Sequence, residues 1–175
     1  MRLLCCATLL AIMTGCAATG TAPKRFTTDT ISFGIVVSNI DKALVFYKDA
    51  VGLTEVGGFD VPAEMARDAG LSNNKPFHVH VLKTTDVPEA TQVKLMQFLD
   101  TPGARPDNSF IHSTYGVRYL TIRVADIDAA MARAAKAGVK PIAKGPYRLA
   151  SGQFLAIVRD PDGNMVELIG PKRSG

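Results

Sequence analysis

Two histidines in one short apolar stretch are the side chains of this sequence best suited to bind a metal. His78 and His80 alternate with apolar residues, so in a strand both imidazoles would lie on one side, away from its apolar face. We expect that side to face a ligand cavity. An imidazole pair of this spacing, completed by a third ligand such as Glu167, can chelate zinc or nickel. The alternative is a pair of histidines that is hydrogen-bonded to neighbours or to solvent.

A column of polar side chains marks a second stretch as a ligand-binding surface. Tyr119, Thr121 and Arg123 alternate with apolar residues, which places a phenol, a hydroxyl and a guanidinium on one face of a strand. Together they can grip an anionic or oxygen-rich ligand. The alternative is that Arg123 only covers the end of the sheet with its aliphatic stem. Met96, in another strand-like stretch, adds soft apolar surface that suits a hydrophobic small molecule.

Other kinds of chemistry find little support in the sequence. No Ser-His-Asp order, Gly-rich phosphate loop or Cys-x-x-Cys pair stands out, so covalent catalysis is not indicated. The formal net charge is +4, but acidic and basic residues are interspersed, and no run of Lys or Arg indicates nucleic-acid binding. With 47% hydrophobic residues among 175, the chain can bury the core of one domain.

The first residues predict export rather than part of the fold. Arg2 precedes an apolar stretch, residues 3–13, which is shorter than the roughly 20 residues needed to cross a bilayer. The segment Met-Thr-Gly-Cys that ends at Cys16 resembles a bacterial lipobox, which implies cleavage before Cys16 and lipid attachment to its sulfur. We expect a signal peptide over 1–15, a tether over 16–29 and a membrane-anchored protein that faces the periplasm. Ala17, in place of an Asp, favours the outer membrane. The alternative is an ordinary secretory signal that is cleaved a few residues later.

The rest of the chain is expected to contain two copies of one module, because residues 35–43 resemble residues 122–130. Each copy begins with an alternating strand (31–37 and 117–124) and a helix between a capping residue and a glycine. Three strand-like runs follow each helix: 53–58, 77–83 and 92–98, then 140–143, 153–159 and 165–170. The pattern predicts an α+β domain over 30–172, with modules at 30–100 and 116–172 and a linker at 101–115.

Two motifs at opposite ends of this duplicated chain carry a family resemblance. They are Ser-Asn-Ile-Asp-Lys-Ala-Leu-Val-Phe-Tyr-Lys-Asp-Ala-Val-Gly-Leu at 38–53 and Arg-Asp-Pro-Asp-Gly-Asn-Met-Val-Glu-Leu at 159–168. Both resemble the vicinal oxygen chelate superfamily of glyoxalases, bleomycin resistance proteins and dioxygenases. The resemblance implies that the sheets of two β-α-β-β-β modules curl around one cup, with helices outside, and that the cup holds a substrate, often over a divalent metal. Many members complete the cup in a homodimer or by exchanging modules, and the sequence leaves that arrangement open.

The resemblance also assigns four cup positions, which are Ser32, Lys94, Tyr119 and Glu167 in this sequence. In metal-using members these positions supply His, Gln or Glu ligands, and the metal spreads the negative charge of the intermediate. Only Glu167 is such a ligand, since an ammonium has no lone pair and Ser and neutral Tyr are poor donors to a divalent ion. We therefore expect no cofactor, and an ion pair between Lys94 and Glu167 where the metal would sit. The alternative is that Lys94 reaches the rim and Glu167 is solvated.

Three functions follow as hypotheses. In the first, which we prefer, the anchored protein binds a small organic ligand in the cup without a catalytic metal. In the second, it is a glyoxalase-like lyase, an isomerase or a ring-cleaving dioxygenase that holds a divalent ion through His78, His80 and Glu167. In the third, it is a structural lipoprotein whose cup is packed shut. The residues expected to line an open cup are Ser32, His80, Lys94, Met96, Tyr119, Thr121, Arg123 and Glu167.

Overall fold

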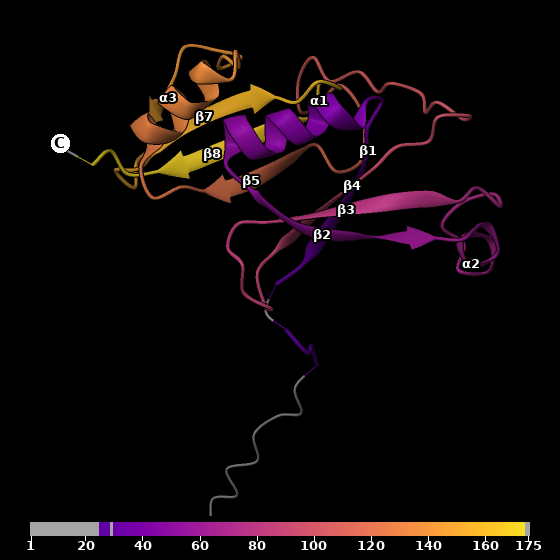
Figure 1. Cartoon of the computed structure of the whole chain (residues 1–175). Coiled ribbons are helices and arrows are strands. Elements are labelled where there is room, and N and C mark those ends of the chain that lie inside the picture. Colours follow the sequence, from indigo (N-terminus) through magenta and orange to yellow (C-terminus); the bar gives the residue numbers. More distant parts are fainter. Residues whose placement is uncertain (1–24, 29, 174–175) are drawn as a thin grey trace, which may run out of the picture.

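The computed structural model describes residues 25–28 and 30–173. They form two four-stranded sheets, with strand orders β1-β4-β3-β2 and β5-β8-β7-β6 (Figure 1). The predicted signal peptide and Cys16 lie outside these residues. No helix within the described part of the chain is long and apolar enough to span a bilayer.

Each sheet is built by one module. The first module consists of β1 (Ser32–Val36), α1 (Ile40–Val45), the π-helix η1 (Phe46–Val51), β2 (Thr54–Val61), α2 (Ala63–Asp68), β3 (Phe77–Lys83) and β4 (Gln92–Met96). The second consists of β5 (Tyr119–Arg123), α3 (Ile127–Lys136), β6 (Tyr147–Arg148), β7 (Phe154–Arg159) and β8 (Met165–Gly170). In both sheets the first strand of the module runs parallel to the last, and the other neighbours are antiparallel. The predicted α+β duplication is confirmed.

The predicted starts of the two long helices are confirmed by their caps. Asn39 accepts a hydrogen bond from the backbone N–H of Lys42, and Asp126 accepts one from that of Asp128. These bonds satisfy backbone donors that have no partner within the helix. The expected end of the first helix is also confirmed, since Gly52 follows η1 with φ = 93°, a conformation that favours glycine.

One stretch does not form the strand that we expected. Residues 140–143 are irregular, and the strand beside β7 is the two-residue β6. Pro141 lies within the predicted run and has no N–H to donate to a neighbouring strand. A single backbone hydrogen bond of 2.9 Å, from Ile142 N–H to Ile157 O, holds this segment beside β7. The edge of the second sheet is therefore shorter than that of the first.

One hydrophobic core joins the two modules. It contains side chains of η1 and α3 and one face of each sheet, and Figure 1 shows α3 lying over β7 and β8. Burying a large apolar side chain contributes about 1.5–3 kcal/mol, so this shared core fixes the two sheets relative to each other. The largest side chains buried in it are Tyr47, Leu82, Leu95, Ile127, Val158, Val166 and Leu168.

Polar contacts between the modules reinforce the core. The Tyr47 hydroxyl donates to Asp160 Oδ2 at 3.1 Å, and both residues are buried. In the other direction, Arg133 Nη2 on α3 donates to the carbonyl oxygen of Val51 at 2.7 Å. Since this core takes one face of each sheet, the opposite faces are left to contact solvent or a ligand, except where α2 covers part of the first sheet through a small second cluster of Val61, Ala66 and Val79. We call these the open faces.

Candidate functional site

The register of the first sheet brings three predicted residues together on its open face. Paired residues of neighbouring strands lie on the same face, and residues alternate along a strand. Ser32 pairs with Gln92 and Val36 with Met96, so Lys94, midway between Gln92 and Met96, shares their face. The alternate residues of β4 are buried in the core. Ser32, Lys94 and Met96 therefore lie on the open face.

The second sheet brings together the predicted residues of β5 and β8, which are Tyr119, Thr121, Arg123 and Glu167. Thr121 pairs with Glu167, and its hydroxyl donates to Glu167 Oε1 at 2.7 Å. Tyr119 and Arg123 flank Thr121 on the same face, and Arg123 Nη1 donates to Gln153 Oε1 at 3.3 Å. The predicted polar column therefore exists and lies on the open face.

The histidines of β3 lie on the other face. His80 pairs with Leu95, which is buried in the core, whereas Lys94 points to the open face. The imidazoles of His78 and His80 do share one side of their strand, with ring centroids 4.7 Å apart. The expectation that they face the same cavity as Lys94 and Glu167 is nevertheless wrong. Alternation determines which residues share a side, but it does not determine which side meets the helices.

The alternative metal ligands His78, His80 and Glu167 are consequently not assembled. His78 Nδ1 lies 2.7 Å from Asp60 Oδ1, and His80 Nδ1 lies 2.9 Å from Glu55 Oε1. Over residues 25–28 and 30–173, no group of three or more His, Cys, Asp or Glu side chains is placed to hold a metal ion.

The expected ion pair between Lys94 and Glu167 is not formed either. Neither residue takes part in any of the ion pairs that the described residues form. Lys94 is on β4 and Glu167 on β8, each the second strand of its sheet, next to β1 and β5 respectively. The four cup positions thus offer a hydroxyl, an ammonium, a phenol and one carboxylate, and the carboxylate already accepts a hydrogen bond. This donor set does not fit a divalent ion.

Two pockets lie between β1 and β5, each lined by residues of both strands, and we call this boundary the seam. Each has a volume of about 410 Å³. Because Phe33 and Leu120 line both pockets, we treat the two as one groove and call it the seam groove. The first pocket is also lined by Ser32, Gly34, Ile35, Val36, Val117, Arg118, Tyr119, Asn164 and Met165, and the second by Leu53, Thr84, Thr85, Thr91, Val93, Thr121, Ile122 and Arg123.

The seam groove combines apolar walls with two polar regions. Phe33 and Leu120 form its apolar middle, where the two pockets meet. Arg123 and four threonines are among the residues that line the second pocket. Tyr119 and Ser32 are among those that line the first. An apolar cavity with a few converging polar groups is typical of a small-molecule site.

Half of the predicted cup residues line the seam groove. Ser32, Tyr119, Thr121 and Arg123 do so, whereas His80, Lys94, Met96 and Glu167 line neither of its pockets. Sequence reasoning missed Phe33 and the threonines at 84, 85 and 91. The repeated threonines beside a predicted strand end were the available signal, but strand alternation alone could not place them next to β5.

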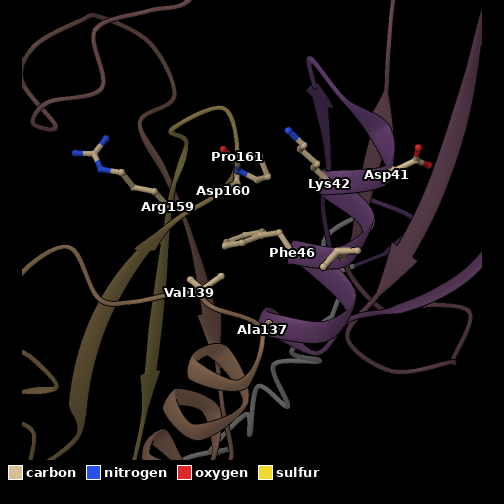
Figure 2. A pocket seen from close by; sticks show the side chains of 9 residues that line it. Asp41, Lys42, Phe46, Ala137, Val139, Arg159, Asp160 and Pro161 are labelled. Carbon is tan, nitrogen blue, oxygen red and sulfur yellow. The ribbon is translucent and has the colours of Figure 1, made fainter.

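A further pocket of about 430 Å³ lies on the helix side, where the modules meet. Figure 2 shows Lys42 and Phe46 of the first module facing Val139 and Pro161 of the second. Arg159 reaches away from them and donates to the carbonyl oxygen of Ser109 at 3.0 Å. None of the predicted site residues lines this pocket. Arg159 therefore anchors the segment between the modules rather than pointing into this pocket.

Comparison with known proteins agrees with this geometry. The family model described as the Glyoxalase/Bleomycin resistance protein/Dioxygenase superfamily matches residues 29–168. Among solved structures, a glyoxalase family protein from Bacillus cereus has a TM-score of 0.71 at 21% identity, covering 87% of this chain and 99% of that chain. No curated protein sequence matches the chain.

Two further solved structures with this fold have more specific descriptions. The trypanothione-dependent glyoxalase I of Leishmania major has a TM-score of 0.51 at 21% identity, over 79% of this chain and 84% of that one. TnmS3, an antibiotic binding protein from a Streptomyces species, has a TM-score of 0.51 at 25% identity, over 83% of this chain and 97% of that one. The match over residues 29–168, together with the duplicated β-α-β-β-β fold, shows that the chain belongs to the glyoxalase/bleomycin resistance protein/dioxygenase superfamily.

Proposed function

We propose that the domain binds a small organic molecule in the seam groove, without a catalytic metal, and that this molecule has an apolar body and an anionic or oxygen-rich end. The observation that carries the proposal is the composition of the groove: the apolar side chains of Phe33 and Leu120 lead to a pocket that holds Arg123 and four threonines. The volume of about 410 Å³ for each pocket is within the range of small-molecule sites.

Arg123 is the group best placed to recognise an anion. Its side chain is exposed on the open face, and its contact with the neutral Gln153 amide is long, at 3.3 Å. A guanidinium has five N–H donors, so most of its donors remain able to bind a carboxylate or sulfonate. Such charge-assisted hydrogen bonds are roughly twice as strong as neutral ones. Thr121, next to it on β5, donates its hydroxyl to Glu167 and so can accept a hydrogen bond from a ligand.

The comparisons support a binding role for this fold. TnmS3 is an antibiotic binding protein, so a relative of this shape serves to hold an organic molecule. The glyoxalase I of Leishmania major represents the enzymatic alternative. The donor set at Ser32, Lys94, Tyr119 and Glu167 favours the binding role, because three of these four side chains are poor ligands for a divalent ion.

A titration with the fluorescent probe 1-anilinonaphthalene-8-sulfonate tests the proposal, since the probe joins an aromatic body to an anion. We expect saturable binding to the wild type and about tenfold weaker binding to Arg123→Gln, because a hydrogen bond to a charged group is worth about 1.5–3 kcal/mol. The matched control is Arg148→Gln, which removes an exposed arginine that lies outside the seam groove. This control is expected to bind the probe like the wild type.

A neutral competitor separates charge recognition from apolar binding. Decanol should displace the probe equally well from the wild type and from Arg123→Gln, because the apolar middle of the groove is unchanged. Decanoate should bind Arg123→Gln more weakly than it binds the wild type, because the variant lacks the guanidinium. Equal probe affinities for Arg123→Gln and Arg148→Gln would contradict the proposed site.

We also propose that this domain works outside the cytoplasm as a lipid-anchored protein that faces the periplasm, with Cys16 as the lipidated residue. The support is the apolar stretch of residues 3–13 and the Met-Thr-Gly-Cys segment, residues 13–16, at its end. Several acyl chains on one cysteine would give a stable anchor where a single chain would be marginal. Cys16→Ser should release the protein from membranes, and unchanged membrane retention of this variant would contradict the anchor.

A further inference from the structure

The two histidines of β3 form a cluster that the seam groove does not use. They lie on the helix side of the first sheet, with their imidazole ring centroids 4.7 Å apart and the ring planes at 72°. The His78 side chain is 47% exposed and the His80 side chain 26% exposed. Both rings can therefore be reached from solvent, and they are close enough to bind one ion together.

Each imidazole is held by a carboxylate through the same nitrogen. His78 Nδ1 lies 2.7 Å from Asp60 Oδ1, and His80 Nδ1 lies 2.9 Å from Glu55 Oε1. Because a carboxylate only accepts hydrogen bonds, the proton of each neutral ring is on Nδ1, and the lone pair is on Nε2. Metal-binding histidines are oriented by carboxylates in this way.

The two carboxylates hold the rings from different positions on the neighbouring strand. Asp60 and Glu55 lie toward opposite ends of β2. His78 Nε2 lies only 2.5 Å from the position that a Cβ at residue 58 would take, and Gly58 is the direct strand partner of His80. The Nε2 edge of His78 therefore extends toward His80 across a glycine that leaves room for it.

We propose that the Nε2 atoms of His78 and His80 bind one divalent transition-metal ion, such as Zn²⁺, Ni²⁺ or Cu²⁺, with water completing the coordination. Imidazole nitrogen is a preferred ligand of these ions. The surrounding charge also suits a cation, since Asp60 and Glu55 carry two negative charges and Lys48, paired with Glu55 at 2.9 Å, carries one positive charge. The site lies on the face of the sheet opposite Lys94, so it is separate from the cup positions, and none of its residues lines the seam groove.

The hydrogen bonds of the two Nδ1 atoms with Asp60 and Glu55 leave Nε2 as the coordinating nitrogen of each ring. Metal binding should weaken in acid, because a protonated imidazole has no lone pair to donate.

Calorimetric titration of the full chain with Zn²⁺ tests the site. We expect His78→Gln and His80→Gln each to lower the affinity at least tenfold. The matched control is His112→Gln, which removes the remaining histidine of the chain; it is stacked on Phe110 outside the cluster and should leave the affinity unchanged. Asp60→Asn and Glu55→Gln, which change only the orienting carboxylates, should weaken binding by about 10- to 100-fold.

Paramagnetic broadening by Ni²⁺ gives a second readout that identifies the ligands directly. Sub-stoichiometric Ni²⁺ should broaden the imidazole proton resonances of His78 and His80 and leave those of His112 sharp. The proposal is overturned if all three histidines broaden equally, or if Zn²⁺ affinity is the same for the wild type, His78→Gln and His80→Gln. Because no variant here touches the seam groove, binding of the anionic fluorescent probe should be unaffected, so the two proposals fail independently.

Discussion

Replacing Tyr47 with Phe tests how strongly one hydrogen bond holds the two modules together. The Tyr47 hydroxyl donates to Asp160 Oδ2 at 3.1 Å across 113 positions of sequence, and the tyrosine is fully buried. A phenylalanine fills the same space without the hydroxyl, so the change removes the bond and leaves the packing in place.

The size of the effect depends on the hydrogen bonds that the Asp160 carboxylate keeps in the variant. A hydrogen bond to a charged group is worth about 1.5–3 kcal/mol. The Asp160 carboxylate still accepts from the backbone N–H groups of Asp162 and Asn164 and from the Asn164 amide, so it is not left without partners. We therefore expect Tyr47→Phe to lower the free energy of unfolding by about 1.5–2 kcal/mol, toward the lower end of that range.

Urea unfolding measures this loss. The midpoint of the Tyr47→Phe variant should fall without a change in m, because the surface that is exposed on unfolding stays the same. The matched control is Tyr147→Phe, at an exposed tyrosine (67%), which should change the free energy of unfolding by less than about 0.5 kcal/mol. If Tyr47→Phe is as stable as this control, the account of the contact between the modules is wrong.

The pH dependence gives an independent check on the same bond. Burial, together with the nearby Asp160 carboxylate, raises the pKa of Tyr47 far above its ordinary value near 10. The folded protein then keeps a proton that the unfolded chain releases, so this stabilisation is complete below about pH 10 and declines as the pH rises further. The advantage of the wild type over Tyr47→Phe should therefore shrink as the pH rises above about 10. An advantage that grows with pH would contradict this reasoning.

Two further stability changes follow from the structure. Glu55→Gln should remove a contribution to stability that depends on pH. The hydrogen bonds with His80 and Lys48 lower the pKa of Glu55. The wild type should therefore have the higher free energy of unfolding above the unfolded-state pKa of about 4.3, and this difference should decline as the pH falls below it. Urea unfolding at several pH values measures this, and a difference that stays constant down to pH 3 would count against it. Arg133→Met removes the hydrogen bonds to Val51 O and Ala50 O and should cost about 1–3 kcal/mol in thermal or urea unfolding. Lys136→Met, on the exposed side of the same helix, should cost less than about 0.5 kcal/mol, and equal losses for the two variants would refute the assignment.

The duplicated fold could be predicted because its signals are local. Capping residues such as Asn39 and Asp126, the apolar spacing of the helices and the alternation of β5 each constrain a short stretch, and the structure agrees with all of them. The polar column of Tyr119, Thr121 and Arg123 followed from the same alternation. The missing strand at 140–143 is the exception, and its cause, Pro141, was present in the sequence.

The assembly of the site could not be predicted in the same way, because it depends on which strands meet. Alternation placed His78 and His80 on one side of β3 but could not show that this side carries Leu82 and faces the helices. The pairing of Lys94 with Glu167 assumed that β4 and β8 face each other closely, whereas the strands that meet at the seam are β1 and β5. Long-range arrangement of this kind leaves little trace in a single stretch of sequence.

Nuclear magnetic resonance of the isotope-labelled protein during titration with decanoate tests the central claim, that the seam groove is the ligand site. We expect saturable shifts of the backbone amide signals along both strands that line the groove, Ser32–Val36 and Tyr119–Arg123. The shifts should be smaller in the Arg123→Gln variant. Shifts confined to the helix-side pocket around Phe46 and Val139, or no saturable shift at all, would contradict it.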